Sequence, residues 1–451
     1  MSKRLFAGLV MAALLSASPV AAQPDWTVRP EWVRAHARFL ASDALQGRGS
    51  ATRDEAIAAA YVAARFEEYG LKPAPGMTGY LQTARVVRLR LDGPPLLTVD
   101  GVSIAAPSLL IGSGGTAAGR LTVFGGGDPA AMPAADIVIA TGSGVSAMQL
   151  FRSLRERKGK LLIVRESTDT HEMLGRFGGK PRLPTYLEGN APKSATSLIA
   201  LPAKAFDALT HQSGSLVAFT LPDIARDESV TTNAVGYLPG RDPKAGVLLY
   251  SAHLDHLGVR PDGVVMPGAN DDASGTTAVL ELAHALATGR APRRGILFVA
   301  YGSEEIGGFG ASWFAMHPPV PLGDIVANIE FEMIGSQDPK FPRGSLMMTG
   351  YERSNLGQAL ARHGALISAD PYPDEHFFER SDNYGLALKG IVAHTLSGWA
   401  VVPTYHQPTD TVSALDIDFM TRAIQSLIKP ARWLANSRFR PEWKAQGRPV
   451  E

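Results

Sequence analysis

The chain has 451 residues, a formal net charge of +1, 45% hydrophobic and 19% charged residues, and no cysteine. A chain of this length can bury a large core and is expected to form two structural units. The near-neutral charge gives no electrostatic reason for binding nucleic acid or an anionic membrane. The absence of cysteine excludes thiolate catalysis, cysteine-ligated zinc and iron–sulfur clusters.

Residues 1–22 are predicted to be a secretory signal peptide. Lys3 and Arg4 form a basic start, residues 5–15 are apolar, and "VAA" at 20–22 is a small-residue cleavage site. The apolar stretch is shorter than the roughly 20 residues that span a bilayer. We therefore expect an exported protein, periplasmic or secreted, without stable insertion in the membrane.

Residues 23–95 are expected to open the main domain with helices. The segment "DEAIAAAYVAARFEEYG" (54–70) places apolar residues such as Ile57 and Phe66 on one helical face and ends at a glycine. The texture changes over residues 96–224, where short apolar runs such as "LTVF" and "KLLIV" are separated by Gly, Pro and Asp clusters. This pattern predicts an inserted, small β-rich domain with one or two helices.

From residue 225 to residue 451, strand-type runs alternate with helical segments. "GVLLYSAH" leads to "SGTTAVLELAHALATG", and "RGILFVAYG" leads to "ASWFAMH". This alternation predicts an α/β fold in which a mixed, mostly parallel sheet is sandwiched by helices. Ligands of such sheets bind beyond the carboxyl ends of the strands, so polar residues that follow apolar runs are the candidate site residues. They are His253, Asp255, Asp271, Asp272, Glu304, Glu305, Glu330, Glu332, His406 and Asp410.

Several unrelated strand ends thus carry only His and carboxylate groups. Imidazole and carboxylate suit a borderline divalent metal, with zinc as the first choice and cobalt or manganese as alternatives. Two metals about 3.5–4 Å apart need a carboxylate that bridges them. Two His and three carboxylates can build such a site if one carboxylate is shared.

Five motifs occur in the order "SAHLDHLG", "GANDDASG", "GSEEIGGFGAS", "IEFEMIG" and "PTYHQPTDTV". Together they resemble the motif set of the two-zinc exopeptidases of clan MH, which include bacterial leucyl aminopeptidases and aminopeptidase Y. "FLASDALQGRGS" and "RSDNYGLALKGI" are also similar to secreted bacterial members of that family. The segment 96–224 is similar, in position and in "KGKLLIV", to the protease-associated (PA) domain inserted in many such enzymes.

The resemblance implies two Zn²⁺ per chain, held in the zinc exopeptidase fold of the phosphorylase/hydrolase-like type. Carried over onto this sequence, it implies His253 and Glu332 as ligands of one zinc. It implies Glu305 and His406 as ligands of the other zinc, with Asp271 bridging both ions.

Glu304 is left over by this assignment, and the resemblance implies that it is the general base. It would take a proton from a water molecule activated by the metals and pass it to the leaving amine. Asp255, two residues after His253, would accept a hydrogen bond from that imidazole and fix its tautomer. Asp410 could serve His406 in the same way.

Two positions depart from the family pattern. Asp is more frequent than Glu at the position of Glu332, and Glu330, on the same face of the strand, is the competing ligand. Asn383 stands where His is common, which puts a substrate contact in doubt rather than metal binding. His256, beside Asp255, is expected to be a loop residue near the site.

The sequence therefore predicts a zinc-dependent metallo-aminopeptidase that hydrolyses the N-terminal bond of peptide substrates. A carboxypeptidase or a glutaminyl cyclase on the same fold is an alternative, and a non-catalytic, receptor-like relative is a third possibility. Cyclases of this type use one zinc, and Arg380 is the single nearby cation that a carboxypeptidase could use for the substrate's carboxylate.

Overall fold

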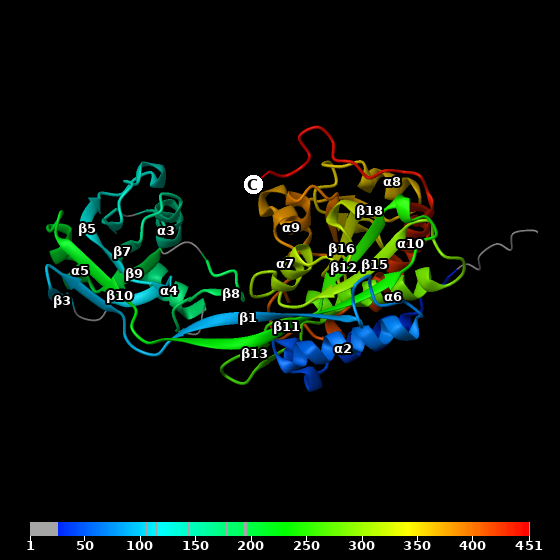
Figure 1. The fold of residues 1–451 in the computed structure, drawn as a ribbon, viewed down its shortest axis with the longest axis horizontal. Coiled ribbons are helices and arrows are strands. Elements are labelled where there is room, and N and C mark those ends of the chain that lie inside the picture. The colour runs from blue at the N-terminus through cyan, green and yellow to red at the C-terminus, as the bar shows by residue number, and fades with distance from the viewer. Residues whose placement is uncertain are drawn as a thin grey trace, which may run out of the picture.

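The computed structural model describes residues 26–450, apart from 105–106, 114, 143, 177–178 and 193–195. The predicted signal peptide, residues 1–22, lies outside the described residues. Figure 1 shows two lobes that lie side by side and are joined by a long two-stranded ribbon. We call them the main lobe and the inserted lobe.

The main lobe is built on a nine-stranded mixed sheet. Its strands are β1 (Leu81–Leu91), β8 (Thr185–Leu187), β11 (Ile224–Leu238), β12 (Val247–His253), β15 (Gly295–Tyr301), β16 (Ile325–Glu332), β17 (Leu346–Met348), β18 (Ile367–Ala369) and β19 (Ala393–Ser397). Their order across the sheet is β18-β17-β19-β16-β12-β15-β11-β1-β8. The central strands β19, β16, β12 and β15 are parallel, whereas β11, β1 and β8 continue the sheet antiparallel.

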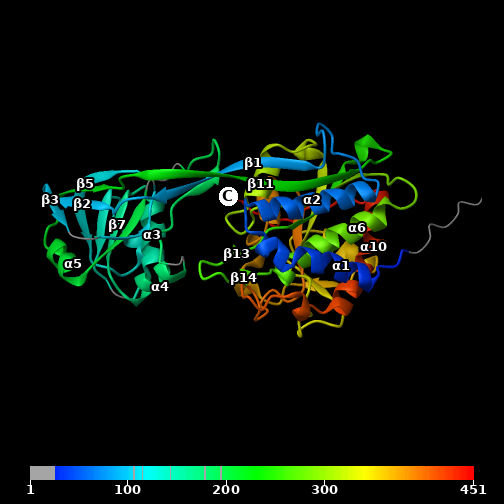
Figure 2. The same cartoon turned by 90° about the horizontal axis from the view of Figure 1, so that it is seen from below.

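Helices cover both faces of this sheet. They are α1 (Pro30–Leu40), α2 (Arg53–Glu68), α6 (Gly275–Ala287), α7 (Phe309–Met316), α8 (Leu356–Arg362), α9 (Asn383–Leu388) and α10 (Ile417–Asn436). Figure 2 shows α1, α2, α6 and α10 on one side of the main lobe, where they form one core cluster with the sheet. α7 and α9 pack on the opposite face in a second cluster. β12 and β15 are buried over their full length, as expected for parallel strands covered on both faces.

The predicted fold class, an α/β fold with a mixed sheet between helices, is confirmed. The apolar face of 54–70 forms α2, which begins after Thr52 because the Thr52 side chain accepts hydrogen bonds from the N–H groups of Asp54 and Glu55. In the described part of the chain, no helix has the length and apolar character needed to cross a membrane.

The inserted lobe is built on an eight-stranded sheet. Its strands are β2 (Leu96–Val99), β3 (Val102–Ile104), β4 (Ser108–Ile111), β5 (Ala117–Phe124), β6 (Ile137–Ala140), β7 (Leu161–Arg165), β9 (Ser197–Leu201) and β10 (Leu216–Thr220). The order is β3-β2-β10-β5-β6-β7-β9-β4, and β5, β6, β7 and β9 are parallel. Its helices are α3 (Ala147–Glu156), α4 (Thr168–Arg176) and α5 (Ala203–Thr210). The described part of the inserted lobe thus contains three α-helices, one more than the one or two expected. The additional helix was missed because α4 and α5 are too short for a clear periodic pattern.

The two lobes share strands. β1 and β11 pair antiparallel from Leu81↔Ala234 to Leu91↔Ile224 and form the ribbon between the lobes. β8 belongs to the segment 96–224 by sequence, yet it pairs with β1 as the edge strand of the main sheet. The division into 23–95, 96–224 and 225–451, and the PA-like identity of the insert, stay predictions.

Candidate active site

The carboxyl ends of the central strands bring the five predicted metal-binding side chains together. In the sheet register, His253 lies opposite Tyr301 and Ser251 lies opposite Glu330, so the ends of β12, β15 and β16 lie at one level. The five are His253 at the end of β12, Asp271 in the irregular turn η4 (Ala269–Ser274), Glu305 after β15, Glu332 at the end of β16, and His406 after β19.

The first donor group consists of His253, Asp271 and Glu332. Nε2 of His253 lies 3.2 Å from Oδ1 of Asp271 and 3.4 Å from Oε1 of Glu332. One donor atom from each residue lies within 4.8 Å of the other two. His253 and Asp271 are buried, and Glu332 is half-buried. Three converging donors at this spacing could hold one divalent cation.

The second donor group shares Asp271 with the first. Nε2 of His406 lies 3.2 Å from Oδ2 of Asp271 and 3.2 Å from Oε2 of Glu305. Asp271 therefore turns one oxygen to each group, as a bridging carboxylate does. All donors are nitrogen or carboxylate oxygen, and the three carboxylates outnumber the two imidazoles. The chemistry of this donor set fits a pair of borderline dications such as zinc.

Glu332 reaches this site and Glu330 does not. Oε2 of Glu332 accepts a hydrogen bond of 2.5 Å from the Ser381 hydroxyl, which turns Oε1 towards His253. Glu330 is fully buried, and neither of its oxygens has a hydrogen-bond partner among the described residues. Burial, together with the charge of Glu332, raises the pKa of Glu330 well above its usual range. The geometry thus favours Glu332 as the donor.

Asp255 connects His253 with the two adjacent glutamates. Nδ1 of His253 lies 3.2 Å from the backbone carbonyl oxygen of Asp255 and 3.6 Å from its Oδ1. The same Oδ1 accepts a hydrogen bond of 3.0 Å from the backbone N–H of Glu304. Oδ2 accepts one of 3.3 Å from the N–H of Glu305. Asp255 thus contacts His253 as expected, but it is the backbone oxygen rather than the carboxylate that lies at hydrogen-bond distance from the ring. The carboxylate fixes the backbone from which both glutamates extend.

Asp410 contacts other groups than the ring expected for it, and Asn383 has its partners inside the fold. The two carboxylate oxygens of Asp410 accept hydrogen bonds from the N–H groups of Asn270 (2.8 Å) and Asp271 (3.1 Å). Asp410 therefore holds the turn that carries Asp271 rather than the ring of His406. Asn383 is fully buried, and its Oδ1 accepts a hydrogen bond from Thr395, so it supports the fold instead of lining the site.

Backbone strain is concentrated beside the site residues. Ser303, Met333 and His406 have φ angles of 56°, 52° and 54°, a left-handed conformation that residues other than glycine rarely adopt. Ser303 directly precedes Glu304, and Met333 directly follows Glu332. His406 is itself one of the donors. Gly310 then closes the loop, since a Cβ there would lie 2.2 Å from the Gly302 carbonyl oxygen. The sequence gives no sign of this strain, because Ser, Met and His are not residue types that indicate a left-handed backbone.

Arg48 and Ser50, in the segment "QGRGS", were not predicted as site residues. The fully buried guanidinium of Arg48 donates 2.8 Å hydrogen bonds to the carbonyl oxygens of Leu254, Pro267 and Gly268. The Ser50 hydroxyl donates a hydrogen bond of 2.5 Å to Oδ2 of Asp255. These contacts tie the N-terminal segment to the loops that present His253 and Asp271. The sequence carries no local signal for these contacts, because their partners lie about 200 residues further along the chain.

Glu55 is a second buried support that sequence reasoning missed. Its carboxylate accepts hydrogen bonds from the N–H groups of Ala51 (2.7 Å) and Thr232 (2.9 Å) and from the Ser303 hydroxyl (2.9 Å). It thereby holds the strained residue that precedes Glu304. Burial, and then the charge of Asp255, raise the pKa of Glu55 to about 7.

Glu55 should make the stability of the fold depend on pH. Its pKa is about 7 in the folded chain, against an ordinary value of 4.5, so the folded chain keeps a proton that the unfolded chain loses between these pH values. The free energy of unfolding therefore falls as the pH rises through this window, by about 3 kcal/mol from this group. Urea unfolding from pH 4.5 to pH 8 measures the slope. In Glu55→Gln this contribution should vanish, and an unchanged slope would refute the assignment.

His256 is more than a loop residue near the site. Its ring is fully buried, with Nδ1 2.7 Å from Oε1 of Glu305 and 3.7 Å from Oδ2 of Asp271. His256 thus occupies one oxygen of Glu305 while the other oxygen faces His406. The sequence signal was present, since His256 follows the "HLD" motif directly.

Replacing His256 by Ala should weaken metal binding without unfolding the protein. Loss of a hydrogen bond that orients a ligating carboxylate typically costs about 10–100-fold in metal affinity. Titration of the metal-free protein against a fluorescent zinc chelator would measure this. His171→Ala, in the inserted lobe, is the matched control and should bind metal like the unmodified protein. Equal affinity of the two variants would exclude a role for His256.

The charges of the site explain why it needs a cation. Burial disfavours the imidazolium of His253, but Glu332, Asp255 and Asp271 outweigh this effect and raise the pKa of His253 well above its usual range. Against burial, Asp271 and Glu305 likewise raise the pKa of His406 to about 10. Without a bound cation, the surrounding carboxylates thus favour the charged imidazolium form of both rings.

The surroundings of Glu304 favour the protonated form of its carboxyl group. Burial raises the pKa of Glu304 well above its usual range, and the charges of Glu332, Asp382 and Glu305 add to this effect although His253 opposes it. A carboxyl group in such a place can accept a proton and release it again, as a general base must.

Part of the chain matches a known peptidase family. Residues 233–429 match the sequence profile of peptidase family M28. The chain contains a peptidase family M28 domain. All seven predicted site residues lie inside the matched M28 region, and the family resemblance seen in the motifs is confirmed.

Relatives of the M28 domain include the probable lipoprotein aminopeptidase LpqL of Mycobacterium tuberculosis. It is 28% identical over 206 residues, which are 38% of this chain and 39% of that protein. The chain therefore matches about two fifths of the length of this curated relative.

Solved structures extend the likeness to the whole fold. An aminopeptidase from Aneurinibacillus sp. strain AM-1 aligns with a TM-score of 0.58 at 18% identity, over 91% of this chain and 94% of that chain. BSAP, a zinc aminopeptidase from Bacillus subtilis, aligns with a TM-score of 0.56 at 19% identity, over 94% and 98%. At these identities the likeness shows a common fold.

Proposed function

We propose that this M28 protein is a zinc-dependent aminopeptidase that removes the N-terminal residue of peptides. One observation carries the proposal: two donor groups share Asp271, and Glu304 directly precedes the donor Glu305, with its backbone N–H bound to Asp255. The activity named for LpqL and the zinc named for BSAP support the same reaction.

The metal ligands in this proposal are His253, Asp271, Glu305, Glu332 and His406, and they would hold two zinc ions. The ions, when bound, would activate a water molecule and polarise the scissile carbonyl. Neighbours already orient two of these donors: Ser381 orients Glu332, and His256 orients Glu305. Because these side chains are already oriented, the site would lose little free energy in reorganising around the bound metal ions.

Glu304 would move the proton. For this it has to come within about 2.6–3.2 Å of the attacking water, accept its proton and deliver it to the leaving amine. Asp255 fixes the Glu304 backbone through the 3.0 Å hydrogen bond to its N–H. Glu305 turns instead to His256 and His406, so the two adjacent carboxylates serve different partners.

Hydrolysis of a panel of amino-acid 4-nitroanilides and short peptides tests the function. We expect cleavage of substrates with a free α-amino group, loss of activity after chelation, and recovery with two zinc equivalents per chain. N-acetylated peptides should resist cleavage. Removal of C-terminal residues, or cyclisation of N-terminal glutamine with one zinc per chain, would contradict the proposal.

We also propose that the protein is exported and acts on peptides outside the cytoplasm, on the strength of the signal-like residues 1–22. Fractionation of cells that produce the full chain, with N-terminal sequencing of the exported form, tests this. A mature protein that begins near residue 23 is expected. Retention of the intact N-terminus in the cytoplasm would contradict it.

A further inference from the structure

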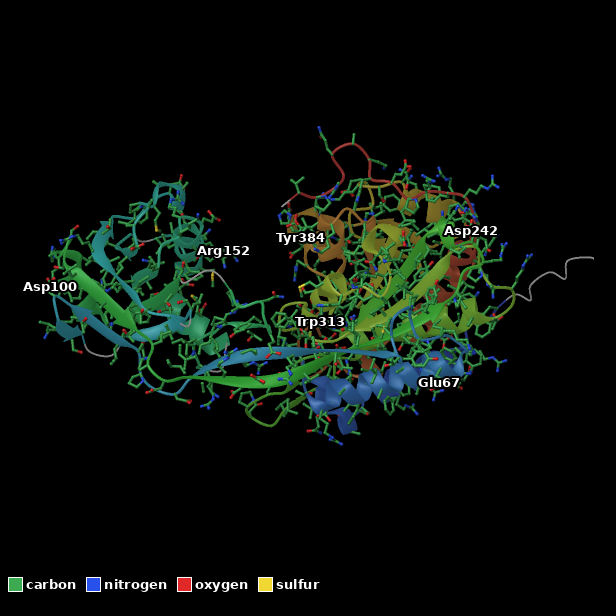
Figure 3. The ribbon with its side chains drawn as sticks, in the orientation of Figure 1. Glu67, Asp100, Arg152, Asp242, Trp313 and Tyr384 are labelled. Atoms are coloured by element: carbon green, nitrogen blue, oxygen red, sulfur yellow. The ribbon has the colours of Figure 1, made fainter. Side chains whose placement is uncertain are left out.

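A cavity of about 680 Å³ adjoins Glu304. Its walls come from the loop after Glu304, from α7 and α9, and from β8 with the residues that follow β8. The apolar side chains Leu187, Phe309, Met316 and Leu386 form much of these walls, and charged side chains, Glu379, Arg380, Asp382 and Lys389, line the rest. Figure 3 shows Tyr384, another lining residue, on the side of the main lobe that is turned to the inserted lobe.

The cavity lies on one side of the proposed reaction centre. Glu304 lines it, and none of the five predicted metal ligands does. A smaller cavity of about 50 Å³ is lined by Glu332 and Tyr405 and not by Glu304. The general base hands its proton to the leaving amine, so the residue that follows the scissile bond has to lie next to Glu304. The larger cavity is therefore on the leaving side.

Among the described residues, β8 is the last strand of the main sheet, so it gives this cavity a wall with an unpaired backbone edge. β8 pairs with β1 at Val87↔Tyr186, flanked by hydrogen bonds from Leu89 N–H to Pro184 O (3.0 Å) and from Glu188 N–H to Arg85 O (2.9 Å). In an antiparallel ladder, alternate residues turn their N–H and C=O groups away from the partner. Thr185 therefore presents its backbone N–H and C=O to the open edge of the sheet. Such an edge can pair with an extended peptide.

β8 also packs against the loop that follows Glu304 and Glu305. Leu187 is 3% exposed and belongs to a small core cluster with Val86 of β1. Ile306 and Phe309, which follow the two glutamates, pack against this cluster. The position of β8 and the position of the Glu304 loop are thus set by the same contacts.

From these contacts we infer that the cavity binds the residues on the leaving side of the scissile bond and selects extended peptides with an apolar residue directly after that bond. The segment 96–224 supplies the selecting wall through β8. This inference rests on the proposed aminopeptidase function. It adds the substrate class, since the side chain that enters the cavity meets Leu187, Phe309 and Met316.

The inference is tested with peptides that share an N-terminal Leu and differ in the second residue, Leu-Phe-Gly and Leu-Lys-Gly. The unmodified enzyme should show the higher kcat/KM for Leu-Phe-Gly. Met316→Glu places a carboxylate in the wall, at a residue 42% exposed that tolerates a charge. This variant should lower the ratio of kcat/KM for Leu-Phe-Gly to kcat/KM for Leu-Lys-Gly at least fivefold. The carboxylate should slow cleavage of Leu-Phe-Gly and speed cleavage of Leu-Lys-Gly.

Leu216→Glu is the matched control, because Leu216 is 58% exposed on β10 of the inserted lobe and does not line the cavity. It should leave the ratio unchanged. Thr185→Pro removes the outward N–H and should lower kcat/KM for tripeptides while leaving Leu-4-nitroanilide hydrolysis intact. If Met316→Glu is active and the ratio of its two kcat/KM values is unchanged, the inference about the cavity is wrong, whereas the proposed function still stands. Absence of N-terminal cleavage in the unmodified enzyme would overturn the proposed function instead.

Discussion

Replacing Glu304 by Gln should leave zinc binding intact and lower kcat by about 10²–10⁴-fold. Gln has almost the same shape, and the hydrogen bond from the residue's backbone N–H to Asp255 does not depend on the side chain. The amide cannot accept the water's proton, so the loss should appear in kcat rather than in metal content. Kinetics on Leu-4-nitroanilide, with zinc determined on the same sample, would measure both quantities.

Glu228→Gln provides the control for this substitution. Glu228 lies on the exposed ribbon and pairs with Arg85, so the same loss of a carboxylate should change neither turnover nor metal content. Full activity of Glu304→Gln would remove the proposed mechanism. Loss of zinc from that variant would show that Glu304 is a ligand and not the base.

Asp271→Asn should have the second large effect, because one carboxylate serves both donor groups. Its two oxygens lie 3.2 Å from His253 and 3.2 Å from His406, and an amide offers a single, uncharged oxygen. We expect the variant to bind fewer than two zinc equivalents after dialysis and to lose nearly all hydrolysis. Elemental analysis and competition with a chelator would measure the first effect.

The comparison for Asp271→Asn is Asp262→Asn in the exposed loop between β13 (Gly258–Val259) and β14 (Val265–Met266). Asp262 forms an exposed ion pair with Arg260, which contributes little to stability. This variant should keep both metals. Two tightly bound zinc ions in Asp271→Asn would exclude a bridging role for Asp271.

Much of the site was predictable because its chemistry follows the strands. His253, Glu305 and Glu332 come at or just after strand ends, and the carboxyl ends of parallel strands meet at one edge of the sheet. Alternation along β16 left Glu330 and Glu332 on one face, and only the fold shows that Glu332 lies beside His253 and Ser381.

The supporting residues were not predictable by the same reasoning. Arg48 and Glu55 act on loops that are distant in sequence, and nothing in their local pattern names a partner. His256 was visible in its motif, but its 2.7 Å contact with Glu305 depends on how two loops approach each other. β8 is a strand of three residues whose pairing with β1 follows from tertiary structure and not from propensity.

The contact of Arg48 with the Leu254 carbonyl oxygen joins residues 206 positions apart in the chain. During synthesis the first half of this contact leaves the ribosome long before the second, and His406 emerges later still. A partly made chain therefore cannot assemble a reaction centre. The topology therefore delays assembly of the donor set until translation is nearly finished.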